Sequence, residues 1–136
     1  MRQGLVVGGA NGIGLSIATE LAKSDEFEKI YIVDKLPVAD EYMCGKFETY
    51  CFDLTNDDYS LFDRFTDIDT LMITAGFGRL ALFRDVTEQY IIDSFSVNTV
   101  AAMRIIKRFY SKLQERTTFR CGVMVSIAGF MSSPFF

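Results

Sequence analysis

Histidine and tryptophan are absent from the 136-residue sequence, which also has only two prolines and three cysteines. Without histidine, the chain alone cannot form a Ser-His-Asp triad, a Cys-His pair or a His-ligated zinc or haem site. The cysteines, Cys44, Cys51 and Cys121, are odd in number and have no C-x-x-C spacing, which argues against both a disulfide framework and a thiolate metal site. We therefore expect no metal site, and we expect the protein to work in the reducing cytoplasm.

The sequence also lacks an excess of basic residues. It has 14 lysines and arginines against 18 aspartates and glutamates, which gives a net charge of -4. This balance disfavours nucleic acid and anionic membranes as partners. No segment approaches the roughly 20 apolar residues of a membrane span, and Asn11 and Ser16 interrupt the apolar opening, unlike a signal peptide. A small molecule is the expected partner.

Hydrophobic residues make up 49% of the chain and charged residues 24%, as in one compact domain. Short apolar runs at residues 5–7, 30–33, 50–52, 70–74 and 122–125 predict strands, and helical spacing after residue 12 and over 85–116 predicts helices. Strands that are continuously apolar and alternate with helices are typical of a parallel sheet covered on both faces. We predict an α/β fold, a Rossmann-like doubly wound parallel sheet, as a single domain over residues 1–136. The expected apolar helix faces are Ile13, Ile17 and Leu21 in the first helix and Ile91, Phe95, Met103, Ile106, Tyr110 and Leu113 in the second.

A glycine cluster separates the first predicted strand from the first predicted helix. Gly8 allows a tight turn, Gly12 allows the backbone to approach a pyrophosphate, and Gly14 allows the helix to pack closely on the sheet. The N–H groups at a helix start attract anions. We therefore expect this turn, including Asn11 and Ile13, to bind the phosphates of a dinucleotide. The alternative is a glycine-rich turn without a ligand.

Asp34 ends the second predicted strand, twenty positions after Gly14. A carboxylate there can accept hydrogen bonds from an adenosine ribose and would repel a 2′-phosphate, so NAD is expected in preference to NADP. Two alternatives stay open: Asp34 is a solvated aspartate at a strand end, or the neighbouring Lys35 presents a cation to the phosphate instead.

The spacing G-x-x-x-G-x-G, formed by Gly8, Gly12 and Gly14, resembles that of the classical short-chain dehydrogenase/reductase family. The resemblance implies an oxidoreductase that acts with NAD on an alcohol or carbonyl substrate. It also implies roles for residues that follow later strands and lie in the long helix. Asp53 and Leu54 match the family's adenine contact, Ala75 and Gly76 match the end of its N-N-A-G motif, Asn98 matches the asparagine of its proton relay, and Ser126 matches its catalytic serine.

Three departures from the family pattern qualify this match. Val7 replaces a threonine, and Ile73-Thr74 replaces two asparagines, so the hydrogen bonds that brace the first and fourth turns are expected to be absent or altered. The family's Tyr-x-x-x-Lys pair lies beyond the serine, whereas the residues after Ser126 include neither tyrosine nor lysine. Because that tyrosine is the general acid, we expect a chain truncated after about the fifth strand, with little or no dehydrogenase activity.

Truncation would also expose a strand edge and a helix face, so we expect a homo-oligomer. The apolar residues Phe77, Leu80, Ile127 and Phe130 suggest an apolar or small substrate. Two alternatives to the enzyme are a non-catalytic, regulatory NAD-binding protein and a methyltransferase, since methyltransferases also use a glycine-rich turn and an acidic residue after the second strand.

Overall fold

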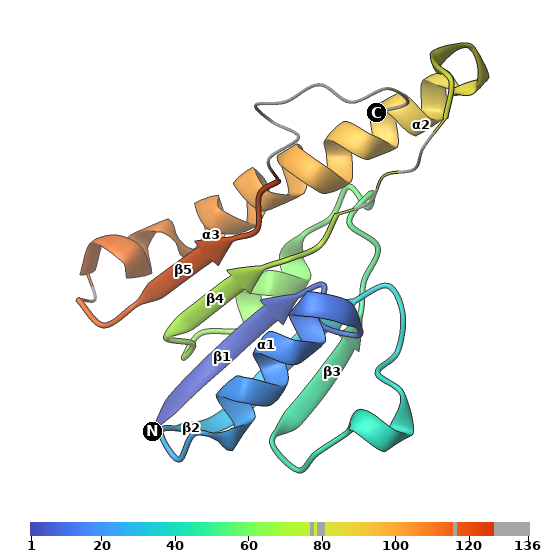
Figure 1. The fold of residues 1–136 in the computed structure, drawn as a ribbon. Helices are drawn as coiled ribbons and strands as arrows, with labels where there is room; N and C mark the ends of the chain where they lie inside the picture. The colour runs from blue at the N-terminus through green and yellow to red at the C-terminus, as the bar shows by residue number, and fades with distance from the viewer. Residues whose placement is uncertain (77, 79–80, 116, 127–136) are drawn as a thin grey trace.

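The computed structural model describes residues 1–76, 78, 81–115 and 117–126 and contains one parallel sheet of five strands (Figure 1). The strand order is β3-β2-β1-β4-β5. The strands are β1 (Arg2–Val7), β2 (Phe27–Asp34), β3 (Phe47–Cys51), β4 (Thr70–Ile73) and β5 (Arg120–Val123). The helices are α1 (Gly12–Lys23), α2 (Glu88–Phe95) and α3 (Ala101–Glu115), and a π-helical turn over Ser96–Val100 joins α2 to α3. This architecture confirms the predicted Rossmann-like α/β fold.

The strand order changes direction at β1, which lies at the centre of the sheet. Val7 pairs with Val33 of β2 on one side and with Ile73 of β4 on the other, so the carboxyl ends of these three strands lie level. The chain continues from β1 to β2 and β3 on one side and returns to β4 and β5 on the other. Open parallel sheets bind ligands outside the carboxyl ends of their strands at such a switch point.

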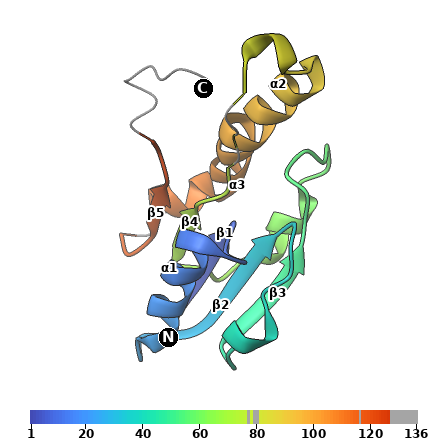
Figure 2. The same ribbon diagram turned by 45° about the vertical axis from the view of Figure 1, so that its right-hand side comes forward.

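Helices α1 and α3 lie on opposite faces of the sheet (Figure 1, Figure 2), and an apolar core fills each face. On one face, Ala18 of α1 is fully buried against a cluster that includes Val6 and Ile32. On the other face, Ile105 of α3 packs in a cluster with Leu5. Because β1 residues alternate between the two clusters, both faces of the central strand are buried, which explains its continuous apolar run.

The predicted apolar helix faces were wrong in part. Ile13, Met103 and Tyr110 are 62%, 68% and 56% exposed. In α3 the buried stripe is Ala101, Ile105 and Phe109, which recur every four residues. Apolar residues occur on more than one side of this helix, so spacing alone could not decide which stripe meets the sheet.

Two predicted strands are also shifted. β3 begins at Phe47, three residues before the predicted run, and β5 covers Arg120–Val123 rather than 122–125. Pairing of Thr70 with Arg120 and of Ile73 with Val123 fixes where β5 lies. Hydrogen bonding to the neighbouring strand therefore sets these bounds, and the apolar pattern follows them only loosely.

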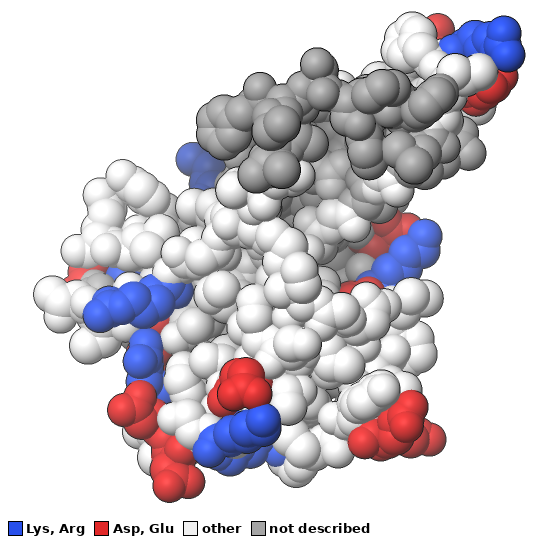
Figure 3. All heavy atoms as spheres, viewed as in Figure 1, with Lys and Arg blue, Asp and Glu red and all other residues white. Residues whose placement is uncertain are grey.

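The described residues carry neither a helix long and apolar enough to cross a membrane nor a group of three or more acidic or cysteine side chains suited to a metal ion. On the face that carries α1, most of the visible lysines and arginines lie beside acidic residues, and they do not gather into one patch (Figure 3).

Candidate nucleotide-binding site

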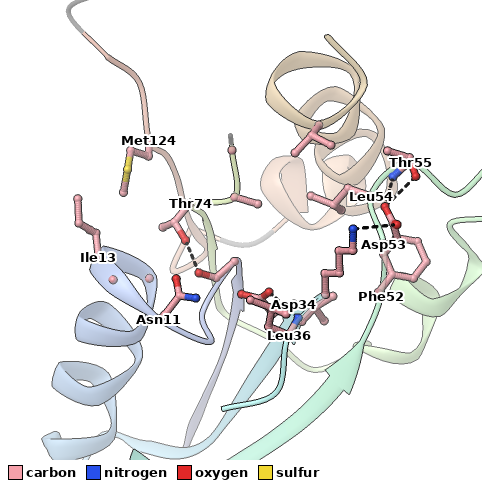
Figure 4. A pocket seen from close by; sticks show the side chains of 18 of the residues that line it. Asn11, Ile13, Asp34, Leu36, Phe52, Asp53, Leu54, Thr55, Thr74 and Met124 are labelled. Carbon is pink, nitrogen blue, oxygen red and sulfur yellow. Dashed lines mark hydrogen bonds and ion pairs between the residues drawn. The ribbon is translucent and has the colours of Figure 1, made fainter. Parts of the chain in front are cut away.

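A pocket of about 700 Å³ opens at the carboxyl ends of β1, β2 and β4 (Figure 4). Its lining comes from the glycine turn, the end of β2 and the segments that follow β3 and β4. All of the residues that the sequence analysis assigned to cofactor binding line it: Gly8, Asn11, Gly12, Ile13, Gly14, Asp34, Asp53, Leu54, Ala75 and Gly76. The fold thus brings together predicted residues that are up to 68 positions apart in the chain, from Gly8 to Gly76.

Two glycines line the floor of this pocket at positions where a side chain would not fit. Gly8 has a φ of +87°, and a Cβ there would lie 2.6 Å from the backbone nitrogen of Ala75. A Cβ on Gly14 would collide with the carbonyl oxygen of Gly8 and lie 2.5 Å from Oγ1 of Thr74. Both positions therefore exclude a side chain, and α1 begins in close contact with the ends of β1 and β4.

Thr74 ties the glycine turn to the end of β4. Its hydroxyl donates to the carbonyl oxygen of Val7 at 2.9 Å and also lies 3.2 Å from that of Gly8. Its backbone N–H donates to the same Val7 carbonyl at 2.8 Å. From Val7 and Thr74, which depart from the family pattern, we expected the hydrogen bonds that brace these turns to be absent or altered. Thr74 does brace the glycine turn through backbone carbonyl groups, so these hydrogen bonds are altered rather than absent.

Asp34 is part of the scaffold of the turn. Its Oδ2 accepts from the backbone N–H of Ala10 at 2.9 Å, and its Oδ1 accepts from that of Leu36 at 3.0 Å. Each carboxylate oxygen has a second lone pair that can accept from a ligand hydroxyl. Asp34 therefore has two fixed hydrogen bonds and remaining acceptor capacity at the pocket wall.

Asp53 lies across the pocket from the glycine turn (Figure 4). Its Oδ1 accepts from the backbone N–H of Thr55 at 2.9 Å and from the Thr55 hydroxyl at 2.8 Å. Its Oδ2 lies 3.8 Å from Nζ of Lys35. The hydrogen bonds from Thr55 and, more weakly, the charge of Lys35 lower the pKa of Asp53 below its ordinary value, so the side chain is an ionised acceptor. The 3.8 Å ion pair also directs the ammonium group of Lys35 toward Asp53.

Asn98 and Ser126, the two candidate catalytic residues, lie outside the described lining of the pocket. Asn98 belongs to the π-helical turn between α2 and α3, and its Nδ2 donates to Oγ of Ser94 at 3.2 Å. A Cβ on Gly76 would lie 2.7 Å from Oδ1 of Asn98, so this carboxamide rests against the pocket edge. Ser126 is exposed and lies three residues beyond the end of β5. The residues expected to shape a substrate site, Phe77, Leu80, Ile127 and Phe130, lie outside the described residues.

Several pocket residues were not assigned to the site from the sequence: Val33, Lys35, Leu36, Phe52, Thr55, Thr74, Asp93, Val97 and Met124. Thr55 had a local signal, because an Asp-x-Thr sequence favours a turn closed by the aspartate. Asp93 and Val97 had none, since only the packing of the long helix over the pocket brings them there.

Solved structures of similar fold cover nearly the whole chain. A short chain dehydrogenase family protein from Francisella tularensis matches 99% of it with a TM-score of 0.82 and 18% identity. An alcohol dehydrogenase from the archaeon Thermococcus sibiricus, complexed with 5-hydroxy-NADP, matches 99% with a TM-score of 0.81 and 22% identity. The bulky-bulky ketone specific alcohol dehydrogenase from Comamonas testosteroni matches 97% with a TM-score of 0.85 and 20% identity. The chain spans 55%, 62% and 57% of these three structures, respectively.

Comparison with sequence models of protein families agrees with the likeness in fold, although comparison with individual curated proteins finds no match. No curated protein matches the chain significantly. The family model for short chain dehydrogenases matches residues 3–136. Because this match covers almost every residue, and the glycine turn, Asp53 and Gly76 meet in one pocket, the chain belongs to the short-chain dehydrogenase/reductase family of oxidoreductases.

Proposed function

We propose that the chain binds a nicotinamide dinucleotide, NAD in preference to NADP, in the pocket at the carboxyl ends of β1, β2 and β4. The observation that carries the proposal is the convergence of the glycine turn, Asp34, Asp53 and Gly76 on one pocket of about 700 Å³. This volume lies within the range of small-molecule and cofactor sites.

The residues of the glycine turn fit the phosphates of such a ligand. Nothing lies within 4 Å of a Cβ added at Gly12, so this position leaves room for a phosphate to approach the backbone, and the first turn of α1 carries no acidic residue. A helix start of this kind stabilises an anion by about 0.3–1 kcal/mol. Favourable attraction of the phosphates therefore needs no basic side chain at this end of the pocket.

Asp34 supports the preference for NAD. Its carboxylate can accept from the ribose hydroxyls, whereas a 2′-phosphate charge about 4 Å away would be repelled by roughly 4 kcal/mol at an effective dielectric constant of 20. Lys35, the nearest candidate cation, lies 3.8 Å from Asp53 instead. NADP would be preferred only if Lys35 left Asp53 for the phosphate. The Thermococcus sibiricus relative, which is complexed with 5-hydroxy-NADP, makes this the alternative to test.

The proposed reaction is hydride transfer between the nicotinamide and the carbon of a small alcohol or carbonyl substrate. A bound nicotinamide cofactor supplies or accepts the hydride. Ser126 would donate a hydrogen bond to the substrate oxygen, and Asn98 would order a water molecule for the proton relay. The residues after Ser126 include neither tyrosine nor lysine. Because general acid catalysis contributes about 10²- to 10⁴-fold in rate, we propose that the 136-residue chain alone turns over little or no substrate.

We further propose a cytoplasmic homo-oligomer. Ile92, Phe95, Met103 and Tyr110 of the long helical segment are 57%, 65%, 68% and 56% exposed, and burial of such side chains against a second copy would stabilise the assembly.

Titration of the purified chain with NADH, NADPH and S-adenosylmethionine tests the binding proposal. We expect saturable binding of NADH, weaker binding of NADPH and no binding of S-adenosylmethionine. Tighter binding of NADPH would overturn the cofactor preference. Binding of S-adenosylmethionine alone would overturn the proposal and favour a methyltransferase.

A further inference from the structure

The segment that follows β3 forms the Asp53 wall of the pocket without regular secondary structure. Asp53, Leu54 and Thr55 line the pocket, and the next helical turn begins only at Ser60. Carbonyl groups of an irregular segment hydrogen-bond to side chains, to other backbone groups or to water. Tyr59 and Arg104 donate to three carbonyl groups of this segment.

Tyr59 holds the carbonyl group of Leu54. Its hydroxyl donates to that oxygen at 2.6 Å, and the residue is only 1% exposed. Its ring packs edge-on against Phe52 at a centroid distance of 5.2 Å and lies 5.6 Å from the ring of Phe62. Burial raises the pKa of Tyr59, so the hydroxyl keeps its proton and remains a donor.

Arg104 reaches the same segment from α3. Its guanidinium carbon lies 3.9 Å from the ring centroid of Tyr59. Its Nη1 donates to the carbonyl oxygen of Asn56 at 3.3 Å, and its Nη2 donates to that of Asp57. One side chain therefore stacks on Tyr59 and fixes two consecutive carbonyl groups, which a flexible lysine could not do equally well.

These contacts determine where the Asp53 carboxylate lies. The backbone N–H of Asn56 donates to the carbonyl oxygen of Asp53 at 3.0 Å, and Thr55 holds Oδ1 of the same residue through two hydrogen bonds. The turn that aims Asp53 is thus anchored at Leu54 by Tyr59 and at residues 56–57 by Arg104. Releasing either anchor would free the turn without removing any pocket side chain.

We propose that Tyr59 and Arg104 are positioning residues that hold Asp53 in place to accept a hydrogen bond from the amino group of an adenine base. The inference rests on the proposed binding of a nicotinamide adenine dinucleotide. It adds base selectivity to that function, because an ionised carboxylate accepts hydrogen bonds and cannot donate them. A base with a carbonyl oxygen in place of the amino group would face Asp53 unfavourably.

The test compares NADH with its hypoxanthine analogue, in which the adenine amino group is replaced by oxygen. We expect the wild-type chain to bind NADH about tenfold more tightly than the analogue, as is typical of a hydrogen bond to a charged group. Tyr59→Phe removes one oxygen atom and keeps the ring. It should raise the Kd for NADH by roughly threefold to tenfold and that for the analogue by less than twofold.

Tyr50→Phe is the matched control. This change also removes one hydroxyl from a tyrosine, here a half-buried one, but the Tyr50 hydroxyl donates to Glu48 at 3.1 Å, and Tyr50 does not line the pocket. This variant should keep the wild-type ratio of the Kd for the analogue to the Kd for NADH. Arg104→Lys should lower the ratio as Tyr59→Phe does. Arg108→Lys, which alters an ion pair of 2.7 Å with Asp63 one turn further along α3, should not lower it.

The outcomes separate this inference from the function on which it rests. A ratio that stays at the wild-type value in Tyr59→Phe, whatever the loss of thermal stability, overturns the positioning role. A wild-type ratio of one also overturns the positioning role, because Asp53 then accepts no hydrogen bond from the adenine amino group. The proposal that the chain binds a dinucleotide is unaffected by that result. If the wild-type chain binds neither dinucleotide, the proposed function itself falls.

Discussion

Substituting alanine at three glycines separates backbone strain from steric exclusion in the pocket floor. Gly8 has a φ of +87° and no space for a Cβ, which would lie 2.6 Å from the nitrogen of Ala75. Gly12 has a φ of +57°, but nothing lies within 4 Å of its added Cβ. Gly45 has neither a positive φ nor a neighbour within 4 Å. An alanine at Gly8 therefore meets both backbone strain and steric overlap, an alanine at Gly12 meets backbone strain alone, and an alanine at Gly45 meets neither.

The expected losses of stability follow from these differences. A left-handed conformation costs an L-residue with a Cβ about 1–2 kcal/mol, which is the whole penalty for Gly12→Ala. Overpacking against the backbone of Ala75 adds about 1–3 kcal/mol, so Gly8→Ala should cost about 2–5 kcal/mol in total. Gly45→Ala should change the free energy of unfolding by less than about 0.5 kcal/mol.

Urea unfolding of the three variants measures these losses directly, with the slope of the transition as a check that the unfolded state is unchanged. NADH titration of the folded variants gives a second readout, because Gly8→Ala displaces Ala75 at the pocket wall, whereas Gly45→Ala leaves the pocket intact. Equal losses for Gly8→Ala and Gly12→Ala would show that the close approach to Ala75 has no energetic weight. A loss for Gly45→Ala as large as either would refute the reasoning from local geometry altogether.

Further substitutions test the charge and surface of the molecule. Asp34→Asn removes the charge that disfavours a 2′-phosphate, so the ratio of the NADPH and NADH dissociation constants should fall by about tenfold or more in fluorescence titrations; an unchanged ratio would assign the preference elsewhere. Met103→Lys places a charge on the exposed helix stripe and should lower the mass found by sedimentation equilibrium; a wild-type chain that is already monomeric contradicts the proposed oligomer. The lowered pKa of Asp53 means that its contribution to stability is present above its ordinary pKa of 3.8 and is lost as the pH falls through the lower folded value. Asp53→Asn should therefore be less stable than wild type at pH 7, with a difference that shrinks below about pH 4 in thermal unfolding; a difference that is independent of pH would contradict this.

The sequence predicted which residues meet at the pocket, because parallel strands share one edge. The pocket segments that the sequence predicted follow apolar runs, as Asp34 follows residues 30–33 and Ala75 follows residues 70–74. Once the runs are assigned to one parallel sheet, their carboxyl ends must lie together, and the residues after them meet. The prediction thus depended on the order of the strands and tolerated errors of two or three residues in their bounds.

The contacts that fix the Asp53 wall were not predictable in the same way. Arg104 meets Asn56 across 48 positions of the chain, with β4 and α2 between them in the sequence. Nothing near Arg104 in the sequence indicates a partner for its guanidinium group. Only the packing of α3 on this side of the sheet puts the guanidinium over Tyr59. Side chains that act on a site through long-range packing leave no local pattern.

Thr74 shows why departures from a family pattern do not measure loss of structure. The sequence has threonine where the family has asparagine, and Val7 lacks the family's hydroxyl, so the bracing of both turns was in doubt. The Thr74 hydroxyl nevertheless reaches the carbonyl groups of Val7 and Gly8, and it bonds to the backbone, which every residue at position 7 provides. A brace that depends on a backbone acceptor tolerates any side chain on the partner strand. The two departures are therefore compatible with an intact glycine turn.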